Sequence, residues 1–238
     1  MRGRLLRILP LGVVLICVGA ALLAVGCSSS TATRFRYVQA ATVPPANVDI
    51  EVDSKTVLTG IGFGQTPTYQ KVSSGSHTVG IFLTGTTTNP TFSGTVSFAS
   101  GDTTLLSINP FTSIALAPFT DDNTVPASGD FKLRIIHASP TSGNVDLYII
   151  TPPGSIAGLS PQKQNLAFSP TGNGSATSYF SFPAGNYEIV MTQAGTQNPI
   201  SGLDASYNLT AGQIRTVLIL DSPNGGGPWS QLELSDLN

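Results

Sequence analysis

The sequence predicts an all-β fold made of two similar halves. Short stretches in which apolar and polar residues alternate recur along the chain; in one of them Val48, Ile50 and Val52 alternate with carboxylates, which a period of two places on the opposite face. Turn residues separate these stretches, and no apolar pattern of helical period is long enough to compete. The segment 144–149 also repeats the segment 47–52. Strands of this kind fit either a sandwich or a barrel.

The two copies can be aligned along most of the chain. The aligned pairs are Asp49 with Asp146, Gly75 with Gly185, and Gly101 with Gly212. The second copy is longer between the first and second of these positions, and we place its extra residues in Thr151–Gly174. Because the repeat is as long as a domain, it predicts two tandem domains rather than a solenoid.

The second copy carries the fuller form of the motif, with His137, Ser139 and Pro140 shortly before Asp146. Together with the later Pro-Ala-Gly-Asn-Tyr turn, it resembles the bacterial envelope family called domain of unknown function 4397. The resemblance covers most of residues 131–238 and, more loosely, 34–122, where Gln39 stands at the position of His137. It implies a β-sandwich fold, secretion and tandem copies, and it implies no known activity.

We therefore predict two tandem immunoglobulin-like, Greek-key β-sandwich domains behind an N-terminal lipoprotein signal peptide. Gly185 and Tyr187 resemble the turn of Greek-key sandwiches in which a Tyr hydroxyl ties a loop to a strand. The predicted segments are a signal peptide at 1–26, a flexible tether at 27–33, a first domain at 34–117, a linker at 118–129 and a second domain at 130–238.

The N-terminus has the features of a bacterial lipoprotein signal. Three arginines precede an apolar stretch at 11–25, and Cys27 follows a small residue. The apolar stretch is shorter than the ~20 residues of a membrane span, so lipidation at Cys27 is favoured over an uncleaved anchor or a plain secretory peptide. We predict that Cys27 anchors the protein to a membrane of the bacterial cell envelope. The outer membrane is favoured because Ser28 gives no inner-membrane retention signal.

Cysteine and charge usage exclude several kinds of site. The two cysteines, Cys17 and Cys27, both lie in the predicted signal segment, so the mature domains have no thiol for a disulfide or a thiolate metal site. The chain has 11 basic and 13 acidic residues, and no basic patch is visible. This pattern argues against nucleic acid as a partner. We also expect no cofactor and no metal.

His137 is a candidate catalytic base or metal ligand. Its counterpart Gln39 can fill neither role, and no second ligand stands at metal-site spacing. We predict instead that His137 lies at a strand end, hydrogen-bonded to nearby backbone. His77 aligns with Tyr187, so packing or a corner role is expected for both.

Asp49 and Asp146 are acidic residues that both copies share. Two carboxylates in one cleft can hydrolyse a glycoside, but these two lie in different predicted domains. We expect each to stabilise the fold by accepting N–H bonds from the loop that leads into its strand. The segment 121–123 offers oxygen ligands for calcium, but it lacks the spacing of a calcium loop, so a solvated linker is favoured.

The sequence reveals no specific activity. We predict a non-catalytic binding or adhesion module that presents sandwich loops to a glycan or protein partner in the envelope. A structural role in the envelope or in a larger complex is the alternative, and a glycan-acting hydrolase is a third hypothesis. The insertion Thr151–Gly174 is either a binding loop or a passive one. Its candidate residues are Pro152, Pro153, Gly154, Pro161 and Pro170.

Overall fold

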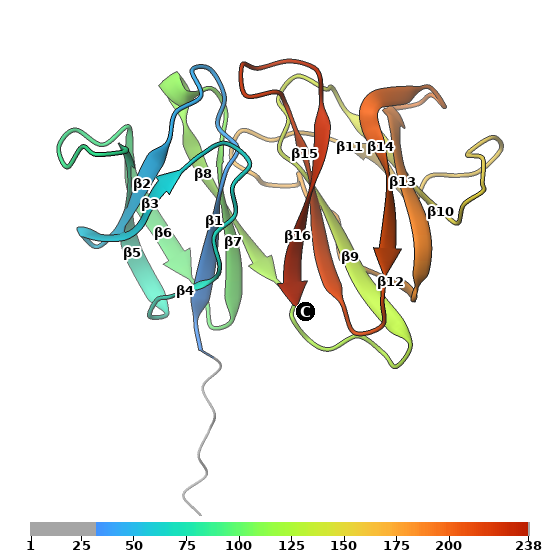
Figure 1. Ribbon diagram of the computed structural model, residues 1–238, viewed down its shortest axis with the longest axis horizontal. Coiled ribbons are helices and arrows are strands. Elements are labelled where there is room, and N and C mark those ends of the chain that lie inside the picture. Colours follow the sequence, from blue (N-terminus) through green and yellow to red (C-terminus); the bar gives the residue numbers. More distant parts are fainter. Residues whose placement is uncertain (1–31, 238) are drawn as a thin grey trace, which may run out of the picture. The chain divides into compact units, whose positions relative to one another are not determined.

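The computed structural model describes residues 32–237, so Cys27, the predicted signal peptide and most of the tether lie outside the described residues. Within 32–237 the chain forms sixteen strands and one short 3-10 turn at Phe111–Ser113. The strands make four sheets of four (Figure 1). Among these residues, no helix has the length and apolar character needed to cross a bilayer.

The strands fall into two halves. The first half contains β1 (Arg34–Gln39), β2 (Val48–Val52), β3 (Lys55–Ile61), β4 (Gln70–Lys71), β5 (Gly75–Leu83), β6 (Phe92–Phe98), β7 (Asp102–Ile108) and β8 (Ala115–Asp121). The second half contains β9 (Asp130–His137), β10 (Val145–Ile150), β11 (Lys163–Leu166), β12 (Phe180–Pro183), β13 (Gly185–Gln193), β14 (Pro199–Leu209), β15 (Ile214–Leu220) and β16 (Ser230–Leu237).

The two halves have the same topology. The sheets of the first half have the orders β4-β1-β7-β8 and β3-β2-β5-β6, and those of the second half have the orders β12-β9-β15-β16 and β11-β10-β13-β14. In each half the first strand pairs in parallel, β1 with β7 and β9 with β15. Each strand of the first half therefore has a counterpart in the same place in the second half, so the repeat seen in the sequence is also a repeat of structure.

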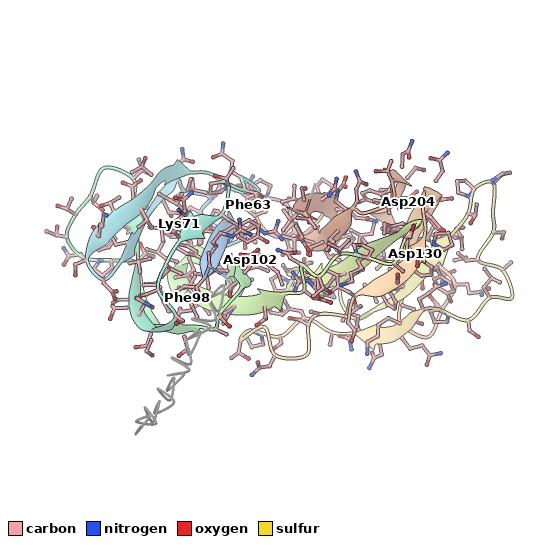
Figure 2. All side chains as sticks on the ribbon, turned by 90° about the horizontal axis from the view of Figure 1, so that it is seen from below. Phe63, Lys71, Phe98, Asp102, Asp130 and Asp204 are labelled. Atoms are coloured by element: carbon pink, nitrogen blue, oxygen red, sulfur yellow. The ribbon has the colours of Figure 1, made fainter. Side chains whose placement is uncertain are left out.

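The four sheets enclose three apolar cores, one within each half and one between the halves. The first-half core includes Phe35, Val48 and Leu105, and the second-half core includes Phe131, Val145 and Val217. The third core joins the sheets that contain β1 and β9, and it includes Val38, Leu106, Ile136 and Leu218. We call these two facing sheets the inner sheets and the other two the outer sheets. Phe63, which packs against the third core, lies at the boundary of the halves in Figure 2.

The third core explains why alternation is lost in the inner strands. In outer strand β2 the burial alternates as predicted, with Val48, Ile50 and Val52 inside. In β7 and β15 every residue is buried, because apolar side chains cover both faces of an inner sheet. The halves therefore share a core and are not joined by a linker alone.

The linker predicted at 118–129 is shorter in the structure. Strand β8 continues to Asp121, which leaves residues 122–129 as the connection to β9. Pro118 lies within β8 and is exposed. Because β8 is an edge strand, a residue without an N–H can be accommodated there.

Candidate functional site

Four charged side chains are buried between the inner sheets. Arg36 and Arg134 are 2% and 3% exposed, and Asp121 and Asp236 are 7% and 6% exposed. The whole chain has only 11 basic and 13 acidic residues, so this is a high local concentration of charge. A buried charge is tolerated only when it is paired and hydrogen-bonded, and each of the four is.

Arg36 of the first half pairs with Asp236 of the second. Its Nη2 donates to Asp236 Oδ1, and its Nη1 donates to the carbonyl oxygen of Ser235 at 2.9 Å. Asp236 Oδ2 also accepts the hydroxyl protons of Tyr179 and Thr216, both at 2.7 Å. The carboxylate thus links an arginine of the other half to two hydroxyls of its own half.

Arg134 of the second half pairs with Asp121 of the first in the same way. Its Nη2 donates to Asp121 Oδ1 at 2.5 Å, and its Nη1 donates to the carbonyl oxygen of Thr120 at 2.9 Å. Asp121 accepts the hydroxyl protons of Tyr69 at 2.7 Å and of Thr104 at 2.9 Å. Each bond across the boundary thus has a counterpart running the other way, as in a two-fold interface.

The two tyrosines close this network into a circle. The guanidinium carbon of Arg36 lies 5.0 Å from the ring centre of Tyr69, and that of Arg134 lies 4.7 Å from the ring centre of Tyr179. The junction ring, as we call it, consists of Arg36, Asp236, Tyr179, Arg134, Asp121 and Tyr69 with Thr104 and Thr216.

Burial and charge set the protonation of the junction ring. Burial opposes the charge of Arg36, but Asp236 and neighbouring groups outweigh burial and raise the pKa of Arg36. Burial raises the pKa of Tyr69 and of Tyr179, and nearby carboxylates add to the effect. At neutral pH the arginine is therefore charged, and both tyrosines keep the protons that they donate.

Two cavities lie against the junction ring. The Tyr179 pocket has a volume of about 430 Å³ and is lined by Asp121, Arg134 and Tyr179, with parts of β8 and of the loop before β12. The Tyr69 pocket has a volume of about 420 Å³ and is lined by Arg36, Tyr69 and Asp236, with parts of β16 and of the loop before β4. Both volumes fall within the range of about 300–1,000 Å³ that small-molecule sites occupy.

The junction ring was not predicted from the sequence, although the repeat contained a signal for it. Arg36 and Arg134 occupy equivalent positions in β1 and β9, and Tyr69 and Tyr179 directly precede the equivalent strands β4 and β12. Asp121, which we assigned to a solvated linker, is buried at the end of β8, so that assignment was wrong.

The neighbours of Asp121 are paired with other side chains. Asp122 accepts from Lys132 Nζ at 2.7 Å, and Asn123 Nδ2 donates to Asp102 at 2.6 Å. Across residues 32–237, no three His, Cys, Asp or Glu side chains are grouped so as to hold a metal ion.

Asp49 accepts backbone N–H bonds, but not from the loop that we expected. Its Oδ1 accepts from the N–H of Gly60 on edge strand β3 at 2.7 Å, and its Oδ2 accepts from the N–H of Gly85 in the β5–β6 turn at 3.1 Å. Burial alone would raise the pKa of Asp49. These N–H groups and the Thr84 hydroxyl outweigh burial and hold the pKa below its usual value.

Asp146 makes the equivalent bonds in the second half. It accepts from the N–H of Asn165 on edge strand β11 at 2.7 Å and from the N–H of Gly195 in the β13–β14 turn at 2.8 Å. The pairing of β10 with β11 shifts register beside Asp146, and Asn165 has a positive φ of 50° there. Asp49 and Asp146 lie on different outer sheets, with both inner sheets between them, so they share no cleft.

His137 lies at the end of β9 and is 1% exposed. Its Nε2 donates to the carbonyl oxygen of Gly143 at 2.8 Å, which is the kind of backbone bond predicted for it. Burial lowers the pKa of His137, so the imidazole is neutral at pH 7. Gln39 holds its own following loop in a similar way, through a bond from Nε2 to the carbonyl oxygen of Ala46 at 3.3 Å.

Ser139 and Pro140 belong to the loop that follows β9. The Ser139 hydroxyl donates to Asp221 and accepts the N–H of Ser142 at 3.0 Å. Ser139 is completely buried, and Asp221 is 2% exposed. These contacts tie the loop of the motif to the end of β15 and leave its hydroxyl inaccessible to a substrate.

Tyr187 and His77 have matching roles in the two halves. The Tyr187 hydroxyl donates to the carbonyl oxygen of Pro183 at 2.8 Å, just before Gly185 begins β13, and its ring packs 5.2 Å from that of Phe131. His77 Nε2 lies 3.0 Å from the carbonyl oxygen of Ser73. Both residues therefore reach back to the carbonyl four residues upstream, a contact more specific than the packing or corner role expected from their alignment.

The insertion Thr151–Gly174 separates into two loops with different positions. The first loop, 151–162, contains Pro152, Pro153, Gly154 and Pro161 and lies against an outer sheet, where Ile156 packs on Tyr148, Ile150 and Val190. The second loop, 167–179, contains Pro170, whose carbonyl oxygen accepts from Asn109 of the first half at 3.3 Å. Residues 172–174 of the second loop line the Tyr179 pocket.

Residues 33–148 match the family model described as domain of unknown function (DUF4397). The DUF4397 match covers the first half and continues through β9 into β10, so it includes the motif of His137, Ser139 and Pro140. We had expected the second copy to carry the closer resemblance, but most of the second half lies outside the matched range. No curated protein matches the chain.

Distant similarities to solved structures extend beyond the DUF4397 match. The Bacillus anthracis TIE protein is 13% identical with a TM-score of 0.27; the match covers 80% of this chain and 34% of that protein. A streptococcal family 41 carbohydrate-binding module that recognises α-glucan is 11% identical with a TM-score of 0.26; that match covers 81% of this chain and 95% of the module.

Proposed function

We propose that this protein is a lipid-anchored, non-catalytic binding or adhesion module of the bacterial cell envelope. The observation that carries the proposal is the pair of cavities at the boundary of the two halves. Both are of ligand size, both have exposed hydroxyl side chains in their lining, and both rest on the buried junction ring. A site on buried, paired side chains is rigid, which reduces the entropy lost on binding.

The positions of the candidate catalytic side chains support a role without catalysis. His137 is buried and bonded to backbone, and Ser139 is inaccessible. Asp49 and Asp146 each accept two backbone N–H bonds on separate outer sheets, so they do not form the carboxylate pair that glycoside hydrolysis needs.

The anchor is proposed from the N-terminal sequence. A basic segment, an apolar stretch, a small residue and Cys27 precede a Ser/Thr tether that leads into β1. In the Cys27→Ser variant, the protein should move from the membrane fraction to the soluble fraction and lose the mass of the lipid. Unchanged partition and mass would refute the anchor.

The binding role is tested with the chain from residue 28 onward and isolated envelope fractions. We expect saturable binding with no release of soluble sugar or peptide. Product release that disappears in Asp146→Ala or His137→Gln would instead support a hydrolase. Recovery of the protein only as a fixed component of one complex, without saturable binding, would support a structural role.

A further inference from the structure

We propose that the two junction pockets are equivalent sites for a neutral, hydroxyl-rich ligand, namely a carbohydrate unit, so that one chain binds two such units. This inference rests on the binding role proposed above and gives that role a ligand class. It comes from the repeat, from the charge balance of each pocket and from the groups that each pocket presents.

The repeat makes the two pockets counterparts of each other. All nine residues that line the Tyr69 pocket have counterparts in the repeat that line the Tyr179 pocket. The shared groups are an arginine paired with an aspartate, a tyrosine, and two exposed hydroxyl residues. The hydroxyl pairs are Thr68 with Ser178 and Ser235 with Thr120, and the Ser235 hydroxyl also accepts from Arg215 Nη1 at 3.0 Å. A ligand that suits one pocket therefore meets the same kinds of group in the other.

The charge balance of both pockets favours an uncharged ligand. In each pocket the buried arginine is already neutralised by a buried aspartate of the junction ring. Each pocket also has one exposed carboxylate in its lining. Asp122 in the Tyr179 pocket pairs with Lys132 at 2.7 Å, and Glu233 in the Tyr69 pocket pairs with Arg215 at 2.9 Å. Because the cations are engaged and carboxylates stand beside them, an anion would be repelled rather than attracted.

The groups that remain suit the hydroxyls and the apolar ring face of a sugar. Serine and threonine hydroxyls can both donate and accept, which matches a ligand whose own groups do the same. The guanidinium of Arg36 has five N–H donors, and its three hydrogen bonds use one on each nitrogen. The tyrosine adds an apolar ring, while its hydroxyl already donates to an aspartate of the junction ring.

The two sites should differ in strength. The Tyr179 pocket has an additional wall from residues 172–174, which belong to the insertion of the second half. The Tyr69 pocket has no counterpart of this wall in its lining. We therefore expect the Tyr179 pocket to bind the same ligand more tightly, and Asn173 to supply an amide that only this pocket has.

The test is calorimetric titration of the chain from residue 28 onward with neutral oligosaccharides of glucose, mannose, galactose and N-acetylglucosamine. Ser178→Trp fills the Tyr179 pocket and Thr68→Trp fills the Tyr69 pocket. Both positions are exposed and lie outside the junction ring. We expect two ligands per wild-type chain, one for each single variant and none for the double variant. The matched control, Ser206→Trp at an exposed position of β14, should keep two.

Milder variants keep the test decisive if a tryptophan disturbs the fold. Ser178→Ala and Thr68→Ala remove one hydroxyl each and should weaken their own site about tenfold while leaving the other unchanged. Full binding in the double tryptophan variant, or a preference for anionic over neutral saccharides, would overturn the inference. Binding to envelope material without binding to any neutral oligosaccharide would overturn the ligand class and leave the proposed function standing.

Discussion

Replacing either aspartate of the junction ring by asparagine should destabilise the protein strongly and by a similar amount. Asp236→Asn keeps the shape of the side chain but leaves the buried charge of Arg36 without its counterion. Asp121→Asn does the same to Arg134. Removing one partner of a buried ion pair typically costs about 3–5 kcal/mol. Each loss would be a large part of a total stability of about 5–15 kcal/mol.

The two aspartate variants should lose nearly the same free energy of unfolding. Each aspartate accepts from one arginine of the other half and from one tyrosine and one threonine of its own half. Because the partners correspond one to one, the two free energies of unfolding should fall by amounts that agree within about 1 kcal/mol, a margin that allows for differences in local packing.

The measurement is urea unfolding, followed by far-UV circular dichroism and by the fluorescence of Trp229. The matched control is Asp122→Asn, one residue along the chain. The Asp122 side chain is 48% exposed and pairs with Lys132 at the surface, so its loss should cost less than about 1 kcal/mol. If Asp121→Asn and Asp236→Asn lose no more free energy of unfolding than this control, the charges of the junction ring are not buried and paired as described. A large loss in only one of them would refute the equivalence of the halves.

Three further predictions concern Asp146, His137 and the third core. Asp146→Ala removes charge-assisted bonds to two backbone N–H groups and should cost about 2–3 kcal/mol without changing ligand binding; a variant that melts like wild type but loses a ligand would make Asp146 a binding residue. Burial lowers the pKa of His137 below the unfolded value of about 6.5, so the unfolded state takes up the proton first as pH falls. The contribution of neutral His137 to the free energy of unfolding is therefore fully present above the unfolded pKa of about 6.5, and it decreases as the pH falls below that value. His137→Gln should flatten the profile of unfolding free energy between pH 8 and 5, and an unchanged profile would count against the buried neutral imidazole. Because the halves share the third core, calorimetry should record a single transition whose calorimetric and van't Hoff enthalpies agree; two separate transitions would show that the halves unfold independently.

The sequence alone determined the features that depend on local pattern. The alternation around Val48 and Ile50 predicted a strand with one buried face, because an outer sheet has solvent on its other side. The repeat predicted two similar halves, and the alignment of His77 with Tyr187 predicted a packing or corner role for both, without naming the carbonyl groups that they contact. The carboxylate of Asp146 was predicted to accept backbone N–H bonds, although its donors depend on a register shift in β11 and on a turn of the next hairpin.

Only the tertiary structure decided what lies between the halves. In an inner strand, a lone arginine among apolar residues looks like a surface position, because no local pattern reports that the second face is also covered. Arg36 and its partner Asp236 are 200 residues apart in the chain, and they meet only because two sheets pack face to face. The insertion shows the same limit: its composition predicted a loop, but the surfaces on which its two parts lie are set by packing. The repeat shows that Arg36 and Arg134 correspond, but the contacts that make the junction site run between the halves, and such contacts leave no period in the sequence.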